Sequence, residues 1–433
     1  MKKIIAISLV AILAVGSVFA AFTGSASTEF GYNIDTKDYG FIGQSNSVSF
    51  DIDVATASAE AIGEGDVYAS IKASLTLSLF SGEKPADFKE AESKILVSSK
   101  DGKSHLGLAF SVDEAKVAGE NWYVSILGMP SAPDFAKSAI DTYKVDKKKL
   151  GVVVKTNGTT KNASNATLFD APKGVEVGYE GYVAGVGLVG DEKSVNAAGY
   201  IATPEYDFDG LKLQVAGTAS KKAGDGKVGT GASAKVGYAT DTLSATVASD
   251  VTLAIPTVEN GKVEFNADVA ANVVYDFVTV DAFYGTNPVT KADKTTTKNL
   301  LSAQVALDLN EYAPVTVKAG IKDAINVSKI FGEVKYLPIE ALTVTVSGDY
   351  EIQGKNAWNV DGAVAYALDF ATVTGKLGYG SDKLLSASLV ASSDTLINGA
   401  TVELGWKDAA DLLNKANDKD NYGVIYTGLT IEF

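Results

Sequence analysis

Several charged residues stand where every second residue is polar, a spacing that places their side chains on one face of an extended strand. In the stretch SVSFDIDV, for example, Asp51 and Asp53 alternate with Phe50 and Ile52. Charges repeated along one face can attract hydrated ions of opposite sign without any reaction step. The charges that qualify by this parity are Glu29, Asp51, Asp53, Lys72, Glu264 and Asp268. We expect them to line an aqueous interior; the alternative, a solvated residue with no selective role, stays open for each.

Covalent and metal chemistry have little support in the sequence. The chain has no cysteine, and His105 is its single histidine, with no nucleophile arranged around it. The glycine-rich stretch GDGKVGTG (Gly224 to Gly231) resembles a phosphate-binding loop only superficially and is more typical of a hairpin turn. We therefore expect no enzymatic activity, no catalytic or metal-binding residues and no cofactor. Calcium held by oxygen ligands stays open.

The charge balance excludes further classes of function. The formal net charge is -15, and all 38 basic residues are lysine because the chain contains no arginine. An acidic protein is a poor partner for nucleic acid. Without arginine, the chain also lacks the planar fork that binds carboxylate and phosphate in a bidentate manner.

The amino terminus has the pattern of a cleaved secretory signal peptide. Lys2 and Lys3 precede an apolar run, and small residues around Ala20 suit a signal peptidase. We expect residues 1–20 to be removed and residues 21–433 to form a single domain. A membrane anchor is the alternative, although the apolar run is short for a spanning helix.

Alternation with a period of two continues along almost the whole mature chain. It is clearest in residues 22–35, 67–79 and 422–433, and it predicts about 16 to 22 strands. The segments 207–211 and 238–242 have the composition of tight turns. Three inserts favour short helices in outer loops: Lys84–Val97, Pro133–Val145 and Lys407–Lys419.

Strands with one polar and one apolar face suit either a soluble sandwich or a membrane barrel. Here the polar face is rich in serine, threonine and glycine, as in a wet interior, and the apolar face is rich in small aliphatic residues that need no packed core. Open sheet edges are not tolerated in hydrocarbon, so a membrane sheet must pair its last strand with its first. We therefore predict an all-β fold, a single closed antiparallel transmembrane barrel. Aromatic residues near strand ends, such as Tyr284, Tyr336, Trp358, Tyr366 and Trp406, are candidates for interfacial belts.

The end of the chain carries a family resemblance. Ile425, Leu429 and Ile431 precede a terminal Phe433 at alternate positions, and Thr427 interrupts the row. This resembles the carboxy-terminal signature of bacterial outer-membrane barrels, which implies recognition of the last strand by the barrel-assembly machinery. By architecture alone the chain is also similar to porins and, more loosely, to the major outer sheath proteins of spirochaetes. It departs from general porins in having no arginine cluster.

A barrel of about 16 to 22 strands is wide enough to enclose an aqueous channel, so we expect an exported outer-membrane porin through which small hydrophilic solutes diffuse. The acidic excess among the candidate inner-face charges predicts a weak preference for cations. The expected partners are outer-membrane lipid, the assembly machinery and the solutes; a homo-oligomer and host surface ligands are further candidates. The alternative function is a surface adhesin or antigen that presents outer loops without transport. A third reading is a secreted soluble β-protein or a surface-layer subunit.

Overall fold

The chain folds as antiparallel strands. The computed structural model describes residues 19–41, 46–55, 67–81, 94–98, 104–126, 135–136, 174–190, 195–221, 226–258, 261–286, 289–290, 296–297, 299–325, 328–353, 356–381, 385–409, 412 and 422–432. In this part of the chain there are strands and no helix.

The first half of the chain contributes β1 (Phe19–Asn33), β2 (Tyr39–Phe41), β3 (Asn46–Ala55), β4 (Tyr68–Ser81), β5 (Lys94–Ser98), β6 (Ser104–Ala118), β7 (Trp122–Ile126), β8 (Gly174–Tyr179), β9 (Tyr182–Gly190), β10 (Val195–Ala202), β11 (Tyr206–Phe208), β12 (Leu211–Lys221) and β13 (Lys227–Ala239). The second half contributes β14 (Leu243–Pro256), β15 (Glu264–Tyr275), β16 (Val278–Gly285), β17 (Val289–Thr290), β18 (Thr296–Thr297), β19 (Leu300–Asp308), β20 (Val315–Ile321), β21 (Lys329–Ile339), β22 (Leu342–Glu351), β23 (Trp358–Ala367), β24 (Thr372–Gly380), β25 (Leu385–Ile397), β26 (Ala400–Ala409) and β27 (Val424–Glu432).

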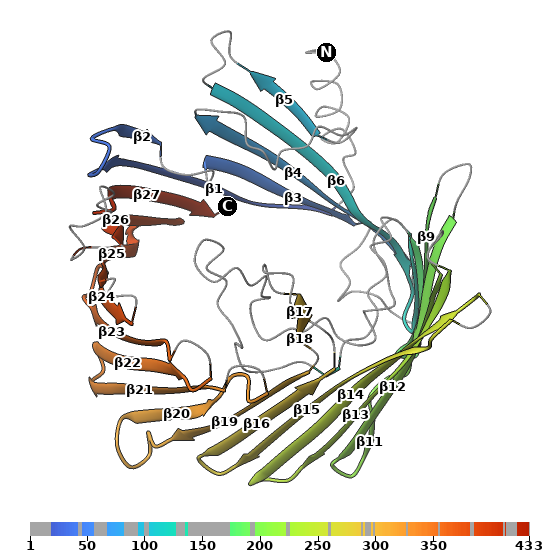
Figure 1. Cartoon of the computed structure of the whole chain (residues 1–433). Helices are drawn as coiled ribbons and strands as arrows, with labels where there is room; N and C mark the ends of the chain where they lie inside the picture. The colour runs from blue at the N-terminus through green and yellow to red at the C-terminus, as the bar shows by residue number, and fades with distance from the viewer. Residues whose placement is uncertain are drawn as a thin grey trace.

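The order of strand pairing returns to its starting point. Apart from the short strands β2, β5, β11, β17 and β18, each strand pairs with the one that follows it along the chain. β27 pairs with β1, from Ser25 opposite Glu432 to Asn33 opposite Val424. The sheet contains 25 strands in the described residues; β2, β5 and β11 each pair along one edge only, which leaves 22 strands in the ring. Figure 1 looks into this ring, with β1 and β27 side by side. The count lies at the upper end of the expected range.

The two rims of the ring differ in their connections. At one rim, which we call the short-turn rim, most hairpins close through a few residues, including 180–181, 209–210, 240–242, 276–277 and 398–399. The longest connections between strands of the ring, 82–103, 127–173, 286–299 and 410–423, leave from the opposite rim, which we call the long-connection rim. At the short-turn rim, Asp209 and Gly210 both have positive φ (57° and 88°), as a two-residue type I′ hairpin requires. The turns predicted in 207–211 and 238–242 are confirmed.

The outer face of the sheet is apolar. Along β14, for example, Val247 is 51% exposed, whereas its neighbour Ala248 is buried. The same holds around the ring, where the exposed large apolar residues include Leu213, Val269, Val280, Val305, Val334, Val346, Val364, Leu377, Leu389 and Leu404. Burial is therefore inverted with respect to a soluble protein, in which large aliphatic side chains pack inside.

The inner face is polar. Buried polar residues on the alternate register include Thr218, Ser233, Asp250, Thr252, Asp268, Asp281 and Ser302. Lys407 of β26 reaches Glu29 of β1 at 2.6 Å across the intervening β27. Strands two apart lie about 10 Å from each other, so such contacts form where side chains converge, on the concave side of the sheet. The polar register therefore faces the middle of the ring.

The expected helical inserts are corrected where the structure describes them. Lys94–Val97 belongs to β5, which pairs with β6, and the residues from Lys407 to Ala409 complete β26. Cross-strand hydrogen bonds outweigh the weak helix propensity of these short segments. The rest of the three inserts, apart from residues 135–136 and 412, lies outside the described residues. So do residues 1–18, and the cleavage site stays a prediction.

Candidate functional site: the charged inner face

Of the six charged residues expected from the alternation, four have side chains in the described part of the structure: Glu29, Lys72, Glu264 and Asp268. Glu29 is opposite Gly428 and pairs with Lys407. Lys72 lies 3.6 Å from Glu114 of β6. Asp51 and Asp53 are part of β3, but their side chains lie outside the described part of the structure.

Two more of these charges lie in the β14–β15 region. Glu264, at the start of β15, forms an ion pair of 2.6 Å with Lys227 of β13. Asp268 is directly opposite Asp250 and both carboxylates are fully covered, with 0% exposure. Asp268 therefore differs from an open wall charge.

Part of the connection between β7 and β8 covers this wall. The backbone N–H of Ala136 donates to Asp250 Oδ2 at 2.6 Å, and both residues are buried. In the view of Figure 1 the short strands β17 and β18 project onto the middle of the ring. At Asp250 the inner face is covered by the protein itself.

A polar network follows the inner face from β6 to β10. The Tyr123 hydroxyl donates to Glu176 Oε1 at 2.6 Å, and the Tyr200 hydroxyl donates to the other oxygen of the same carboxylate. Glu176 and Tyr200 are both opposite Gly185 of β9, so the absence of a side chain at this glycine lets them meet across the strand. Lys116 adds a cation–π contact 4.1 Å from the centre of the Tyr123 ring.

The next region of the wall, from β15 to β22, combines amides, acids and lysines. Asp281 accepts hydrogen bonds from Asn272 at 2.7 Å and from Gln304 at 2.8 Å. Farther round, Asp349 lies 2.8 Å from Lys329 and 3.6 Å from Lys322. Charges on this face are thus largely held in pairs, which fixes their positions along the wall.

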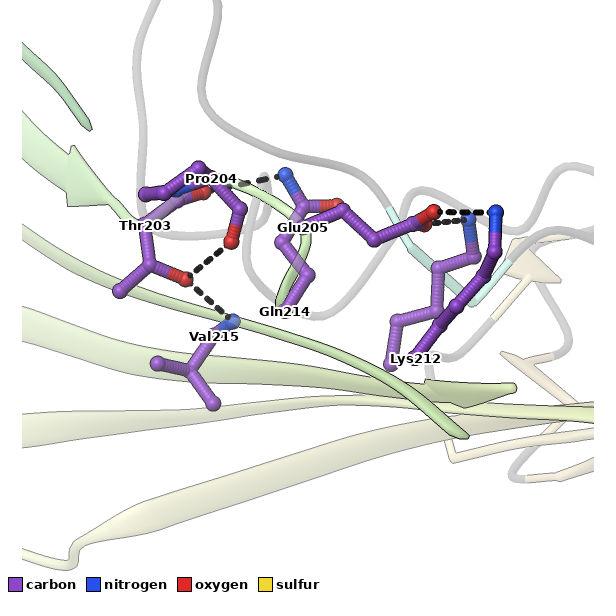
Figure 2. Close-up of polar contacts among 7 residues, drawn as sticks. Thr203, Pro204, Glu205, Lys212, Gln214 and Val215 are labelled. Atoms are coloured by element: carbon purple, nitrogen blue, oxygen red, sulfur yellow. Dashed lines mark hydrogen bonds and ion pairs between the residues drawn. The ribbon is translucent and has the colours of Figure 1, made fainter. Parts of the chain in front are cut away.

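A bulge near the short-turn rim aims another acid at the inner face. Ala202 is opposite Ala216 and Tyr206 is opposite Leu213, so three residues between β10 and β11 face two residues of β12. Pro204 has no N–H to continue the ladder. The side chain of Thr203 supplies a hydrogen bond at this irregular point of the ladder, because its Oγ1 accepts from the Val215 N–H at 3.1 Å (Figure 2).

The extra residue of this bulge brings Glu205 between two lysines. Its carboxylate lies 3.0 Å from Lys212 Nζ and 3.1 Å from Lys235 Nζ (Figure 2 labels Glu205 and Lys212). Glu205 lies in the segment between β10 and β11, at the rim. The hydrogen bond from Lys212, followed by that from Lys235, holds the pKa of this carboxyl below its ordinary value.

The sequence prediction did not include several of these inner-face charges. Glu176 and Asp281 follow the same alternation as the predicted residues, so the alternation could have identified them. It could not have identified Glu205, because the bulge shifts the register by one residue; Pro204 inside a strand pattern is the signal of such an irregularity. His105 lies in β6, and its side chain is outside the described part of the structure.

The charges described on this face can attract ions of opposite sign. No group of three or more histidine, aspartate or glutamate side chains is placed to hold a metal ion among the described residues. In the same part of the chain, no helix has the length and apolarity needed to cross a membrane. In the glycine-rich stretch Gly224 to Gly231, the residues from Lys227 onward belong to β13, and Gly226 directly precedes this strand. Residues 224–225 lie outside the described residues, so the hairpin turn expected here stays a prediction.

The carboxy-terminal residues named by the resemblance lie in β27. Ile425 and Ile431 are exposed on the outer face, and Leu429 shares their register. Val424 and Tyr426, on either side of Ile425, are buried on the inner face. Phe433 is outside the described residues.

Comparison with known proteins gives only distant likenesses. No family model and no curated protein matches the chain. Among solved structures, the translocation pore of the P pilus usher (PapC) is 10% identical, with a TM-score of 0.38, over 95% of this chain and 98% of that one. OccAB2 of Acinetobacter baumannii is 11% identical, with a TM-score of 0.38, over 96% and 97%. A mutant of the Rh. blastica porin is 12% identical, with a TM-score of 0.33, over 96% and 100%. At TM-scores below 0.5 these likenesses carry no functional conclusion.

Proposed function

We propose that this chain is an outer-membrane porin, a closed transmembrane β-barrel through which small hydrophilic solutes diffuse. The inverted burial carries the proposal: large apolar side chains are exposed on the outer face, and acids, lysines and hydroxyls lie on the inner face. Such a surface is costly in water and favourable in lipid. The pairing of β27 with β1 removes the open edges that hydrocarbon does not tolerate.

Aromatic residues support this placement in a bilayer. Near the short-turn rim, exposed aromatics include Tyr179, Tyr182, Phe208, Tyr238, Tyr275, Phe277, Tyr312 and Tyr366. Near the long-connection rim they include Tyr32, Phe265, Tyr284, Tyr350, Trp358, Tyr379 and Tyr422. Phe265 and Tyr275 mark the ends of β15, about 33 Å apart along the strand, or about 25 Å along the membrane normal for a strand tilted by ~40°. This matches the apolar band of outer-membrane barrels.

The size of the ring supports a channel. About eight strands fill their interior with side chains, whereas about 16 or more leave room for water. The chain carries 53 acidic and 38 basic residues, and its inner face mixes both signs. We therefore propose a weak preference for cations. Glu29, Asp51, Asp53, Lys72, Glu264 and Asp268 remain candidate contributors.

Reconstitution into planar lipid bilayers tests the channel directly. We expect discrete conductance steps, and under a salt gradient a reversal potential whose sign corresponds to cation preference. Protein that inserts into lipid without conducting would overturn the porin proposal and favour the adhesin. Protein that stays in the aqueous phase after detergent partitioning would favour the soluble reading.

The proposed partners include the assembly machinery, which would read Ile425, Leu429, Ile431 and Phe433 on the last strand. Deleting Phe433 should then reduce assembly into the outer membrane while synthesis and export continue. Undiminished assembly of the deletion variant would remove this part of the proposal.

A further inference from the structure

The contact between β1 and β27 differs from every other contact in the ring that the described strands form. All other neighbours follow one another along the chain, so a turn or connection limits how they align. β1 and β27 lie at opposite ends of the chain, and no connection sets their register. The register must come from side chains at this seam.

The outer face of the seam offers little discrimination. Its cross-strand pairs join residues such as Tyr32 with Ile425 and Ala26 with Ile431, all facing outward. A slip by one residue would turn polar residues outward and is excluded by the alternation. A slip by two residues keeps every apolar side chain outside, so the outer face cannot reject it.

The inner face of the seam does discriminate. Tyr426 of β27 is opposite Gly31 of β1 on one side and Gly405 of β26 on the other. Its ring needs this space, because a Cβ at Gly405 would lie 3.1 Å from Tyr426 Cε1. A slip by two residues would place Tyr426 beside Glu29 or Asn33 instead of Gly31.

Charge reinforces this fit in size. Glu29 of β1 is opposite Gly428 of β27, and because glycine has no side chain, the Glu29 carboxylate can reach across β27 towards β26. Lys407 of β26 crosses over Gly428's strand to Glu29 at 2.6 Å and lies 4.0 Å from the centre of the Tyr426 ring. The Tyr426 hydroxyl donates to Glu403 of β26 at 3.0 Å. A slip by two residues would move Glu29 about 7 Å along the strand and break its ion pair.

A third contact holds the seam at the long-connection rim. Asp35, in the turn after β1, accepts hydrogen bonds from the backbone N–H groups of Tyr422 at 2.8 Å and Gly423 at 3.4 Å. The Asn33 side chain in turn accepts from the Asp35 N–H at 2.9 Å, which shapes the turn. This contact also depends on the observed alignment.

We propose that Glu29, Gly31 and Asp35 together select the register in which the last strand closes on the first. They do so by recognising Lys407, the Tyr426 ring and the backbone at Tyr422. Because strand stagger and barrel dimensions are linked, the same contacts fix the shear of the closed ring.

The absence of cysteine from the chain allows a direct test by disulfide cross-linking. The double variant S27C/T430C reports the observed register, since the two native hydroxyls are 3.4 Å apart. S25C/T430C and S27C/E432C report slips by two residues in either direction. Each pair is oxidised in membrane-assembled protein, and the cross-linked chain is recognised by its altered mobility after denaturation.

These reporters are combined with seam variants and a matched control. In otherwise unaltered protein and in the control Lys318→Gln, which breaks the Lys318–Glu333 ion pair between β20 and β21, we expect only the native cross-link. With Lys407→Glu or Gly31→Leu we expect loss of most of the native cross-link and the appearance of a slipped one. The exchange Glu29→Lys with Lys407→Glu should restore the native cross-link.

The outcomes decide the proposal in every case. An undiminished native cross-link in assembled Lys407→Glu and Gly31→Leu would overturn it. Should Lys407→Glu fail to assemble, the charge exchange decides, because recovery of assembly in the native register supports the proposal and absence of recovery contradicts it.

Discussion

At the residue scale, several glycines of the inner face leave room for a neighbouring aromatic ring. Gly178 of β8 is opposite Tyr123 of β7, and a Cβ at Gly178 would overlap that ring. The position of the ring matters because Tyr123 donates to Glu176. Glycine here is therefore part of the polar network although it contributes no polar atom.

Replacing Gly178 with alanine should destabilise the protein. The added methyl group must displace the Tyr123 ring and strain its hydrogen bond to Glu176, a form of overpacking that costs about 1–3 kcal/mol. Denaturant titration of the variant in lipid vesicles measures the effect. Gly362→Ala is the matched control, since a Cβ there meets nothing within 4 Å. Equal stability of the two variants would contradict the proposed role of the close approach.

Glu205 gives a prediction about pH. Its pKa is lowered by the two lysines, so the carboxylate stabilises the fold at pH values above its ordinary pKa of 4.5, and this contribution is lost as the pH falls through the lowered pKa. Glu205→Gln should therefore reduce the unfolding midpoint at pH 7 and have a smaller effect at pH 3. A difference that grows on acidification would have the wrong sign.

At the element scale, successive residues of each strand alternate between the outer face and the inner face of the ring. In β14, Val247 points outward with an exposed side chain, and Thr246 points inward between Gly237 and Asn272. A soluble strand would tolerate charge at the exposed position. A strand in lipid tolerates it at the inward position.

Val247→Lys and Thr246→Lys exploit this contrast. If the outer face contacts lipid, Val247→Lys should cost up to about 2–4 kcal/mol, depending on its depth, while Thr246→Lys stays close to the unaltered protein. Folding titrations into vesicles compare the two. On the soluble reading the exposed Val247→Lys would change stability by no more than about 0.5 kcal/mol.

How much the sequence could predict also depends on the element. The alternation predicts strands well, and turn residues such as Asp209 and Gly210 mark hairpins. The helical prediction for Lys94–Val97 and for the start of Lys407–Lys419 is wrong, because these short segments find a strand partner that no local pattern reveals. The Glu29–Lys407 contact joins residues 378 positions apart and depends on the closing register, which alternation does not specify.

At the scale of the whole molecule, the two rims predict an orientation. In outer-membrane barrels the short turns face the periplasm and the long connections face the outside. The short-turn rim, with both ends of the described chain beside it, should therefore be periplasmic. The inner-face bulge at Glu205 would then lie near the periplasmic opening.

Single cysteines introduced into this cysteine-free chain test the orientation. Gln353→Cys lies between β22 and β23 at the long-connection rim, and Asp241→Cys lies in the turn between β13 and β14; both native side chains are exposed. In intact cells a membrane-impermeant maleimide should label Gln353→Cys only. Asp241→Cys should react once the outer membrane is permeabilised. The reverse pattern would invert the assigned orientation.

The even number of strands in the ring limits how the protein can change in size. Deleting one strand would make two neighbours run parallel at one point, with a different hydrogen-bond spacing from the rest of the sheet. Removing a whole hairpin, such as β22 with β23, preserves alternating directions all round and returns both chain ends to the same rim. Wider or narrower versions of this architecture are therefore reached two strands at a time, by duplication or loss of a hairpin.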